Sequence, residues 1–341
     1  MARLKLSVGL PRYERTDALM TGEVVPEGID LIYITPPRVG GVVHGRMLKY
    51  HEYDASEMSM SHFITAKLAG KADFTAIPVF PMRVFFHTRI WVNNRSGIKQ
   101  PADLKGKRIG IMEYGMSMAL WVRGALEHEF GVKPSDIDWV EERTRATKVG
   151  DTAFTKYPEG VVVSEVPQGA TLLNMFLDGE VDAMLLFVGP GSGRNTLQEV
   201  REAEADQSRP RVRPLFDDPK AEGIRYFKKT GLFPINHMVV VKDEILKDNP
   251  WVALSLYDAF QRAKQLSYRK SAEQAEGFSN FIWLNDLQKE VKEVFGDDPY
   301  PYGIKANEKI ITTMASYACE QGFTSRQATI EELFAYNTLN L

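Results

Sequence analysis

Six histidines are the residues of this chain best suited to moving protons, because the imidazole group ionises near neutral pH. They are His44, His51, His62, His87, His128 and His237. His128 lies between Glu127 and Glu129, and we expect it to face water. For the others, the surroundings decide between a general acid or base and a structural hydrogen bond.

Two glutamates, Glu57 and Glu113, are each set among apolar residues. A carboxylate in such surroundings needs a partner, because burying an unpaired charge is costly. Either glutamate could orient a histidine or accept a proton from a substrate. A salt bridge is the commoner role for a glutamate in this setting, so both interpretations stay open.

Two short turns have the groups needed to bind an anion. Residues 113–117 (EYGMS) lead from an expected strand into an expected helix, and residues 59–62 (SMSH) form a similar turn. Unpaired N–H groups at the start of a helix favour a carboxylate, and Ser59, Ser61 and Ser117 add hydroxyls. Ordinary N-capping uses the same groups without a ligand, and we give the two interpretations equal weight.

Arginine offers a second way to hold a carboxylate, through paired hydrogen bonds. The candidates are Arg83, Arg89 and Arg123. Arg83 follows the apolar run VFPM, where its charge needs a partner, and an intramolecular one such as Glu57 or Glu113 is the alternative to a substrate. Arg89 alternates with the apolar Ile90 and equally fits a water-facing position.

Aromatic rings near these polar candidates could stack on a flat ligand. They are Phe80, Phe86, Tyr114 and Phe233. Core packing is the commoner role of such rings, and of the four we keep Tyr114 as a substrate-binding candidate because it lies in the EYGMS turn.

The sequence lacks the short patterns that indicate a metal or nucleotide site. It has no His-x-x-x-His pair, one cysteine, and no loop dense in carboxylates. The segment GKRIG lacks the spacing and the Lys-Ser/Thr end of a phosphate loop. We therefore expect no metal ligands and no cofactor.

Short apolar runs alternate with stretches of helical period, which predicts an α/β fold with parallel sheets. The expected strands are residues 5–10, 108–112, 184–188 and 238–242. Helices are expected at residues 250–269 and 170–178, and after Tyr114, where Ser117 would cap the helix and Gly131 would end it.

The composition is that of an ordinary globular protein, with 44% hydrophobic and 26% charged residues among 341. A formal net charge of −3 argues against nucleic acid or a membrane surface as a partner. The N-terminal segment lacks the long apolar run and cleavage site of a secretory signal. We expect a cytoplasmic protein, and the sequence leaves a homo-oligomer open.

Seven segments together resemble the 4,5-dihydroxyphthalate decarboxylase family, which is itself similar to the substrate-binding proteins of ABC transporters. In chain order they are residues 56–63 (SEMSMSHF), 76–93, 97–132, 178–184 (DGEVDAM), 231–245, 298–307 (DPYPYGIKAN) and 320–334. The pattern GIK-P-DLKGKRIG indicates only the binding-protein fold, whereas SE-S-S, AIPVFP-R--H and DP-PYG--AN are more specific to the decarboxylases.

The resemblance implies a two-lobed fold of the periplasmic-binding-protein type (type 2), with the ligand between the lobes. Residues 1–97 and 234–341 would form one lobe, and residues 98–233 the inserted second lobe. Segments near 91–97 and 233–239 would act as hinges. His62, His87 and His237 fall inside the family-like segments, and this makes them the candidate catalytic histidines, with Glu57 and Glu113 beside the cleft.

One segment departs from the family pattern. After DGEVDAM these decarboxylases usually carry an arginine followed by a proline, whereas residues 185–195 here read LLFVGPGSGRN. The identity of the substrate is therefore left open.

The resemblance implies a cofactor-independent carboxy-lyase that acts on a hydroxylated aromatic acid such as 4,5-dihydroxyphthalate. Ring protonation by His87 or His237 would precede CO₂ loss. The alternatives are a non-catalytic cytoplasmic binding protein for a small aromatic or carboxylate ligand, and another lyase or hydrolase acting on a different ring acid.

Overall fold

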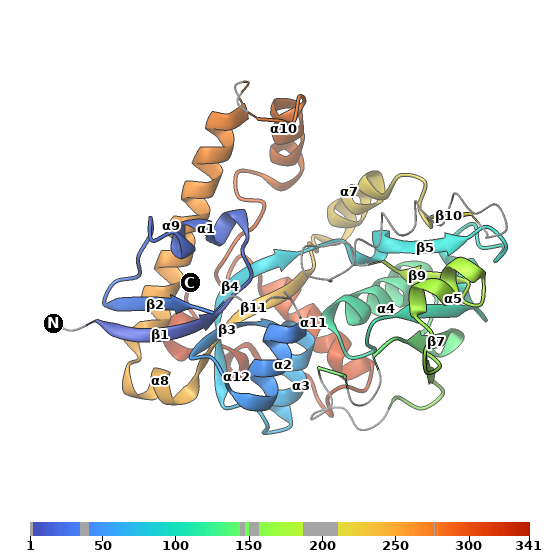
Figure 1. Ribbon diagram of the computed structural model, residues 1–341, viewed down its shortest axis with the longest axis horizontal. Coiled ribbons are helices and arrows are strands. Elements are labelled where there is room, and N and C mark those ends of the chain that lie inside the picture. The colour runs from blue at the N-terminus through green and yellow to red at the C-terminus, as the bar shows by residue number, and fades with distance from the viewer. Residues whose placement is uncertain are drawn as a thin grey trace.

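The computed structural model of the protein describes residues 3–34, 41–143, 147–149, 157–186, 211–275, 277 and 279–341. Two β-sheets, each with helices packed around it, form two lobes that lie side by side (Figure 1). The expected alternation of strands and helices in two lobes is confirmed.

The first lobe is built on a five-stranded sheet of order β2-β1-β3-β11-β4. Its strands are β1 (Leu4–Gly9), β2 (Ile29–Tyr33), β3 (Ala55–Ser59), β4 (Phe74–Arg83) and β11 (Ile235–Lys242). Strands β1, β2 and β3 are parallel, and β11 enters antiparallel between β3 and β4. Every residue of β3 is buried, as expected for a strand covered on both faces.

Helices from both ends of the chain surround this sheet. They are α1 (Glu14–Met20), α2 (Gly41–Tyr50), α3 (Met60–Leu68), α8 (Asp243–Asp248), α9 (Trp251–Ala275), α10 (Leu284–Phe295), α11 (Glu308–Glu320) and α12 (Ile330–Leu333). Helix α9 follows Pro250 as predicted but continues past residue 269. It projects from the lobe with α10 beside its far end (Figure 1).

The second lobe has a six-stranded sheet of order β10-β5-β9-β6-β7-β8. Its strands are β5 (Ile90–Asn93), β6 (Arg108–Ile111), β7 (Asp138–Glu141), β8 (Val162–Glu165), β9 (Ala183–Leu185) and β10 (Val212–Pro214). Its helices are α4 (Ser117–Phe130), α5 (Leu172–Asp178) and α7 (Pro219–Thr230). The strands pair in parallel from β9 through β6 and β7 to β8, which agrees with crossover connections between them.

The chain passes between the sheets twice. It leaves the first sheet after Arg83, runs through a short 3₁₀ segment (Phe86–Arg89) and enters the second sheet at Ile90. It returns between Thr230 and Ile235. Residues 91–93 of the first expected hinge are strand residues paired with β9 and β10, and the hinge itself stays a prediction. We propose that the lobe boundaries lie at residues 84–89 and 231–234.

Three predicted helix ends can be compared with the structure, two at glycines and one at Ser117. Gly131 and Gly179 end α4 and α5 in the left-handed conformation, with φ of 66° and 83°. Glycine adopts this conformation without the steric cost other residues meet. The predicted cap at Ser117 is wrong, because Met116 holds the N-cap position and the Ser117 hydroxyl bonds to the other lobe.

Helix α4 connects the lobes by close packing. The Trp121 indole N–H donates to the carbonyl of Ile235 in β11 at 2.8 Å. Gly124 lies so close to α11 that a Cβ atom there would overlap the ring of Tyr317. Within the described residues, no helix is both long and apolar enough to cross a membrane.

We predict that Gly124→Ala lowers the free energy of unfolding by about 1–3 kcal/mol, because the added methyl group overpacks the contact between α4 and α11. Gly45→Ala in α2 is the matched control, since its Cβ would meet nothing closer than 3.9 Å. Relief of glycine's conformational entropy should there stabilise by about 0.5–1 kcal/mol. Chemical denaturation of both variants measures this, and equal effects would contradict the close approach.

Candidate functional site at the junction of the lobes

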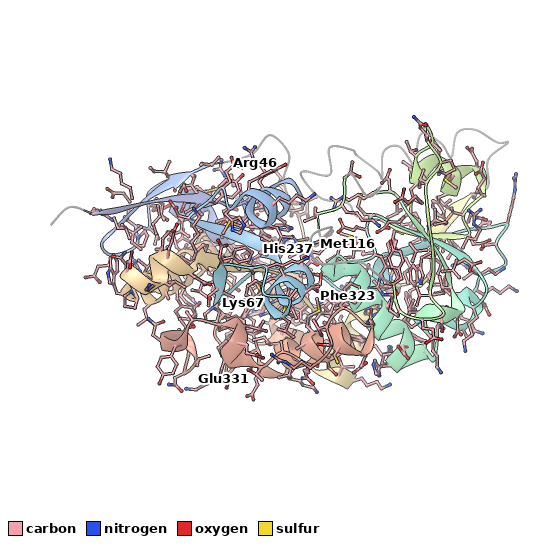
Figure 2. All side chains as sticks on the ribbon, turned by 90° about the horizontal axis from the view of Figure 1, so that it is seen from below. Arg46, Lys67, Met116, His237, Phe323 and Glu331 are labelled. Atoms are coloured by element: carbon pink, nitrogen blue, oxygen red, sulfur yellow. The ribbon has the colours of Figure 1, made fainter. Side chains whose placement is uncertain are left out.

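Two central strands of the first lobe bring Glu57 and His237 together. In the register of β3 with β11, His237 lies opposite Ser59 and Val239 lies opposite Glu57. Alternate residues of a strand share one face, so Glu57 and His237 are diagonal neighbours within side-chain reach. His237 Nδ1 donates a hydrogen bond to Glu57 Oε1. Figure 2 marks the position of His237 among the side chains of the first lobe.

Glu57 is fully buried, and its two side-chain partners come from distant parts of the chain. The Tyr13 hydroxyl donates to Oε1 at 2.8 Å, beside the bond from His237. Burial and the nearby Glu57 raise the pKa of Tyr13 well above its usual value, so Tyr13 keeps its proton and remains a donor. Oε2 has no hydrogen-bond partner within the described part of the chain.

His44 joins this pair, although the sequence analysis assigned it no role. Its ring meets that of His237 edge-on, with 4.4 Å between centroids. Burial and the charge that His237 can carry lower the pKa of His44 well below its usual value, so the ring is neutral. Its apolar neighbours Val43 and Met47 indicated burial, but no spacing in the sequence relates α2 to β3 or β11. We call His44, Glu57 and His237 the histidine–glutamate cluster.

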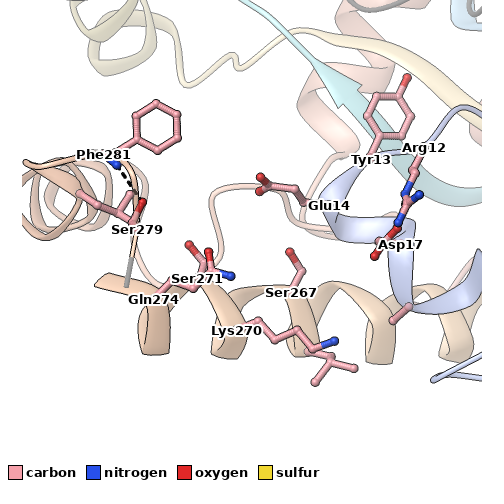
Figure 3. Close-up of a pocket in the computed structure, with 13 residues that line it drawn as sticks. Arg12, Tyr13, Glu14, Asp17, Ser267, Lys270, Ser271, Gln274, Ser279 and Phe281 are labelled. Atoms are coloured by element: carbon pink, nitrogen blue, oxygen red, sulfur yellow. Dashed lines mark hydrogen bonds and ion pairs between the residues drawn. The ribbon is translucent and has the colours of Figure 1, made fainter. Parts of the chain in front are cut away.

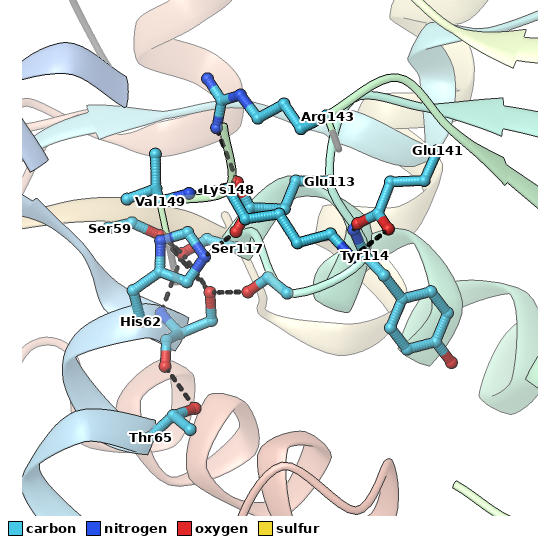
Figure 4. Close-up of polar contacts among 12 residues, drawn as sticks. Ser59, His62, Thr65, Glu113, Tyr114, Ser117, Glu141, Arg143, Lys148 and Val149 are labelled. Carbon is cyan, nitrogen blue, oxygen red and sulfur yellow. Dashed lines mark hydrogen bonds and ion pairs between the residues drawn. The ribbon is translucent and has the colours of Figure 1, made fainter. Parts of the chain in front are cut away.

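A second contact joins the lobes through Glu113, which lies between β6 and α4. Its Oε1 is 3.0 Å from His62 Nε2 in α3, and its Oε2 accepts from Arg143 at 2.8 Å and from the Val149 N–H at 3.0 Å (Figure 4). Burial alone would raise the pKa of Glu113. His62, Arg143 and the Val149 amide outweigh burial and hold this pKa well below its usual range.

The two turns expected to bind an anion are hydrogen-bonded to each other. Ser59 and Ser117 hydroxyls are 2.8 Å apart, the Ser61 N–H donates to the Ser117 hydroxyl at 2.9 Å, and the Ser61 hydroxyl donates to the Gly115 carbonyl at 2.7 Å. All three serines are buried, and Figure 4 includes the contact between Ser59 and Ser117. In this arrangement the Ser61 amide is therefore already satisfied by protein.

Arg83 is buried without a carboxylate among the described residues. Its guanidinium donates to the carbonyls of Phe233 and Pro301, at 3.2 and 2.6 Å, and to the Asn307 side chain. Burial lowers the pKa of Arg83 to about 10. The proposed intramolecular partner, Glu57 or Glu113, is therefore wrong, because neutral oxygens fill that role. Its Nε has no partner in the described ranges.

Arg123 and Tyr114 support the turn between β6 and α4. Arg123 donates to the Gln321 side chain at 2.7 Å and to the Tyr114 carbonyl at 2.9 Å. Its guanidinium lies 3.7 Å from the centre of the Tyr114 ring, which also stacks on Phe323. Both side chains are buried in packing contacts, whereas Arg89 is exposed.

His87 lies apart from these groups. Its Nε2 is 3.2 Å from Glu222 Oε1, and its ring is 4.6 Å from that of Tyr226, both in α7. Among the described residues, no hydrogen bond or ion pair joins it to Glu57, Glu113 or the other candidate histidines. The remaining aromatic candidates, Phe80, Phe86 and Phe233, pack in the core or against other rings.

A surface pocket of about 510 Å³ lies between α1, α9 and the start of α10 (Figure 3). Charged and hydroxyl side chains line it, including Arg12, Asp17, Lys270 and Ser271. Tyr13 is shared between this pocket and the histidine–glutamate cluster, since its hydroxyl bonds to Glu57. The glycine-rich segment 189–193, expected to affect substrate choice, lies outside the described residues.

Known proteins resemble this chain along its length. A 4,5-dihydroxyphthalate decarboxylase of Comamonas testosteroni is 31% identical over 98% of this chain and 97% of its own. One of Pseudomonas putida is 34% identical over 67% of this chain and 83% of its own. The chain belongs to the 4,5-dihydroxyphthalate decarboxylase family. The expectation of a carboxy-lyase of this family is confirmed.

Solved structures define the fold class of this family member. Residues 83–156 match the family model described as NMT1/THI5 like. The periplasmic aliphatic sulphonate binding protein SsuA from Escherichia coli aligns with a TM-score of 0.55 and 16% identity, covering 97% of this chain and 91% of its own. The desulfurization enzyme DSZB aligns with a TM-score of 0.52 and 16% identity, covering 99% and 98%. The expected periplasmic-binding-protein-like fold is confirmed, and both a binding protein and an enzyme share it.

We predict that Glu113→Gln lowers the free energy of unfolding at pH 7 by about 3 kcal/mol, because it leaves Arg143 and His62 without their anion. The folded pKa of Glu113 is depressed, so its stabilising contribution is complete above its unfolded pKa of about 4.3. That contribution is lost as the pH falls towards the folded pKa. Denaturation from pH 7 to pH 3 should show the two proteins converging, and a constant difference would contradict the depressed pKa.

Proposed function

We propose that this protein releases CO₂ from a hydroxylated aromatic dicarboxylate such as 4,5-dihydroxyphthalate. Two relatives that carry this name, one of them similar over nearly the whole chain, support the choice of substrate class. The observation that carries the proposal is the presence of two buried histidine–glutamate contacts at the junction of the lobes. Together they supply the acid and the base that the reaction needs.

The chemistry explains why two proton-transfer groups are needed. Direct loss of CO₂ would leave an aryl carbanion in the ring plane, where the π-system cannot delocalise it. A hydroxyl para to the carboxylate allows another route. A base removes the phenolic proton, an acid protonates the ring carbon that bears the carboxylate, and CO₂ leaves as aromaticity returns. The electrons stay on the ring, so no redox group is required.

We assign the hydroxyl edge of the substrate to the histidine–glutamate cluster. Each of its three side chains contributes one polar atom, and these atoms lie within 4.8 Å of one another, which suits two hydroxyls on adjacent ring carbons. His44 is neutral and its Nε2 is without a partner in the described ranges, so it can accept a hydrogen bond. The Asn236 amide donates to His237 Nε2 at 2.8 Å, which holds the proton of neutral His237 on Nδ1, facing Glu57.

We assign protonation of the ring carbon to His62, with Glu113 as the residue that positions it. An ionised carboxylate 3.0 Å from Nε2 stabilises the imidazolium that a general acid must be. Arg143 and the Val149 N–H fix the other carboxylate oxygen. Replacing Glu113 should therefore affect His62 through orientation and charge rather than through contact with substrate.

Binding of the substrate carboxylates is assigned to Arg83 and to the hydroxyl of Ser59, because the Ser61 and Ser117 hydroxyls already donate within the protein. Arg83 directly follows Met82, which pairs with His237 across β4 and β11. Its free Nε–H is available to a carboxylate. Because Arg123 and Tyr114 bond and stack within the protein, we assign them a supporting role.

Purified protein incubated with 4,5-dihydroxyphthalate is expected to release one equivalent of CO₂ and form the monocarboxylate. Phthalate without hydroxyls should bind but not react, because it has no phenolic proton to lose. Product chromatography and CO₂ detection measure both. Saturable binding of every acid in a hydroxybenzoate and phthalate panel without turnover would instead identify a non-catalytic binding protein.

Substitution of each catalytic histidine is expected to lower kcat strongly. His62→Gln should reduce kcat by about 100-fold or more, the usual contribution of a positioned acid. His237→Gln should also lower kcat, because it removes the donor that orients Glu57 in the cluster. His128→Gln is the control, because His128 is exposed on α4 and contacts Glu320. Steady-state kinetics on variants with unchanged circular dichroism measure this, and near-normal kcat in either variant would contradict its assigned role.

His87 requires a separate test, because it also lies in a family-like segment. His87→Gln removes contacts to Glu222 and Tyr226. We expect it to lower the melting temperature more than kcat. A loss of kcat equal to that of His237→Gln at unchanged stability would restore His87 as the proton donor.

A further inference from the structure

The histidine–glutamate cluster has the donor set of a metal site. His44, Glu57 and His237 each offer one ligand atom, and these atoms lie within 4.8 Å of one another. We propose that the cluster binds one divalent transition-metal ion. Two imidazoles and one carboxylate form the protein part of many zinc and non-haem iron sites, with further positions open to water or substrate.

Unpartnered polar atoms in the cluster support this proposal. His44 Nε2 and Glu57 Oε2 have no hydrogen-bond partner among the described residues, and their side chains are 3% and 0% exposed. Buried polar atoms in proteins nearly always have a partner. An ion between the three side chains would satisfy both atoms at once.

Residues around the three ligands hydrogen-bond to them and can hold them in place, as metal sites require. Tyr13 donates to Glu57 Oε1 and so orients the carboxylate. Asn236 lies against Nε2 of His237, and its Oδ1 has no partner within the described ranges. When an ion binds His237 Nδ1, the ring proton moves to Nε2. The Asn236 side-chain amide, with its oxygen and nitrogen exchanged, then accepts a hydrogen bond from this N–H through Oδ1.

The state of the nearby charges also permits a cation. Arg143, which acts electrostatically on His44, is engaged by the ionised Glu113. This ion pair reduces the repulsion that Arg143 would exert on a cation in the cluster.

The absence of a metal motif from the sequence does not bear on this site. Patterns such as His-x-x-x-His apply to ligands on one element, whereas these ligands come from α2, β3 and β11. An ion held here could chelate two adjacent hydroxyls of an aromatic ring. That role rests on the proposed function, although the site itself does not.

The test is the binding of Co²⁺ and Zn²⁺ to protein first stripped with a chelator and dialysed. We expect one equivalent of Co²⁺ to bind, with visible absorption bands of a nitrogen- and oxygen-ligated site, and Zn²⁺ to displace it. His44→Ala and His237→Ala should each weaken binding at least tenfold. His128→Gln, the control on α4, should bind as the unaltered protein does. Circular dichroism and thermal melting show that each variant is folded.

Absence of saturable binding in the unaltered protein would overturn the proposal, as would equal affinity in His44→Ala and His237→Ala. Decarboxylation by the stripped protein separates the two proposals. Turnover without ion binding leaves the proposed function intact and removes the metal site. Ion binding without turnover of any hydroxylated phthalate keeps the site and contradicts the proposed function.

Discussion

A carboxylate removed from water must be met by positive charge or by donors, and at Glu113 those donors come from both lobes. His62 belongs to the first lobe, whereas Arg143 and the Val149 amide follow β7 of the second. The same carboxylate therefore fixes the turn before α4 and holds the start of α3 against it. The serine hydrogen bonds beside it depend on this approach, because Ser117 reaches Ser59 and Ser61 only when the turns meet.

Glu57 meets the same requirement within one lobe. Its partners are Tyr13, which follows β1, and His237, which lies in β11. The sheet order places β3, which carries Glu57, between these two strands. Strand β11 is decisive, because the chain returns from the second lobe to insert it between β3 and β4. This return brings Asn236 and His237 into a sheet that otherwise consists of residues before 84. A fold shared with a sulphonate-binding protein thus carries acidic and basic groups at the junction of its lobes without a change of architecture.

The two histidine–glutamate contacts differ in a way that suits separate roles. Glu113 has a fully satisfied carboxylate and a depressed pKa, so it acts as a fixed anion beside His62. Glu57 retains an unpartnered oxygen next to the unpartnered His44 nitrogen, within the described part of the chain. The first arrangement fixes a negative charge beside His62, and the second leaves two polar atoms that can bind a ligand.

The sequence by itself determined the α/β class, the family and the C-terminal ends of α4 and α5, because these depend on local signals. Glycine at 131 and 179 stops a helix through its own backbone freedom, and apolar runs form strands wherever both faces are covered. It also selected Glu57, Glu113, His62 and His237 from the family-like segments. Only the tertiary structure decided which of these meet. Glu57 and His237 are 180 residues apart, and His62 and Glu113 lie in different lobes. Sheet order and lobe packing set such contacts, so no spacing along the chain could indicate them, nor the entry of His44 or the separation of His87.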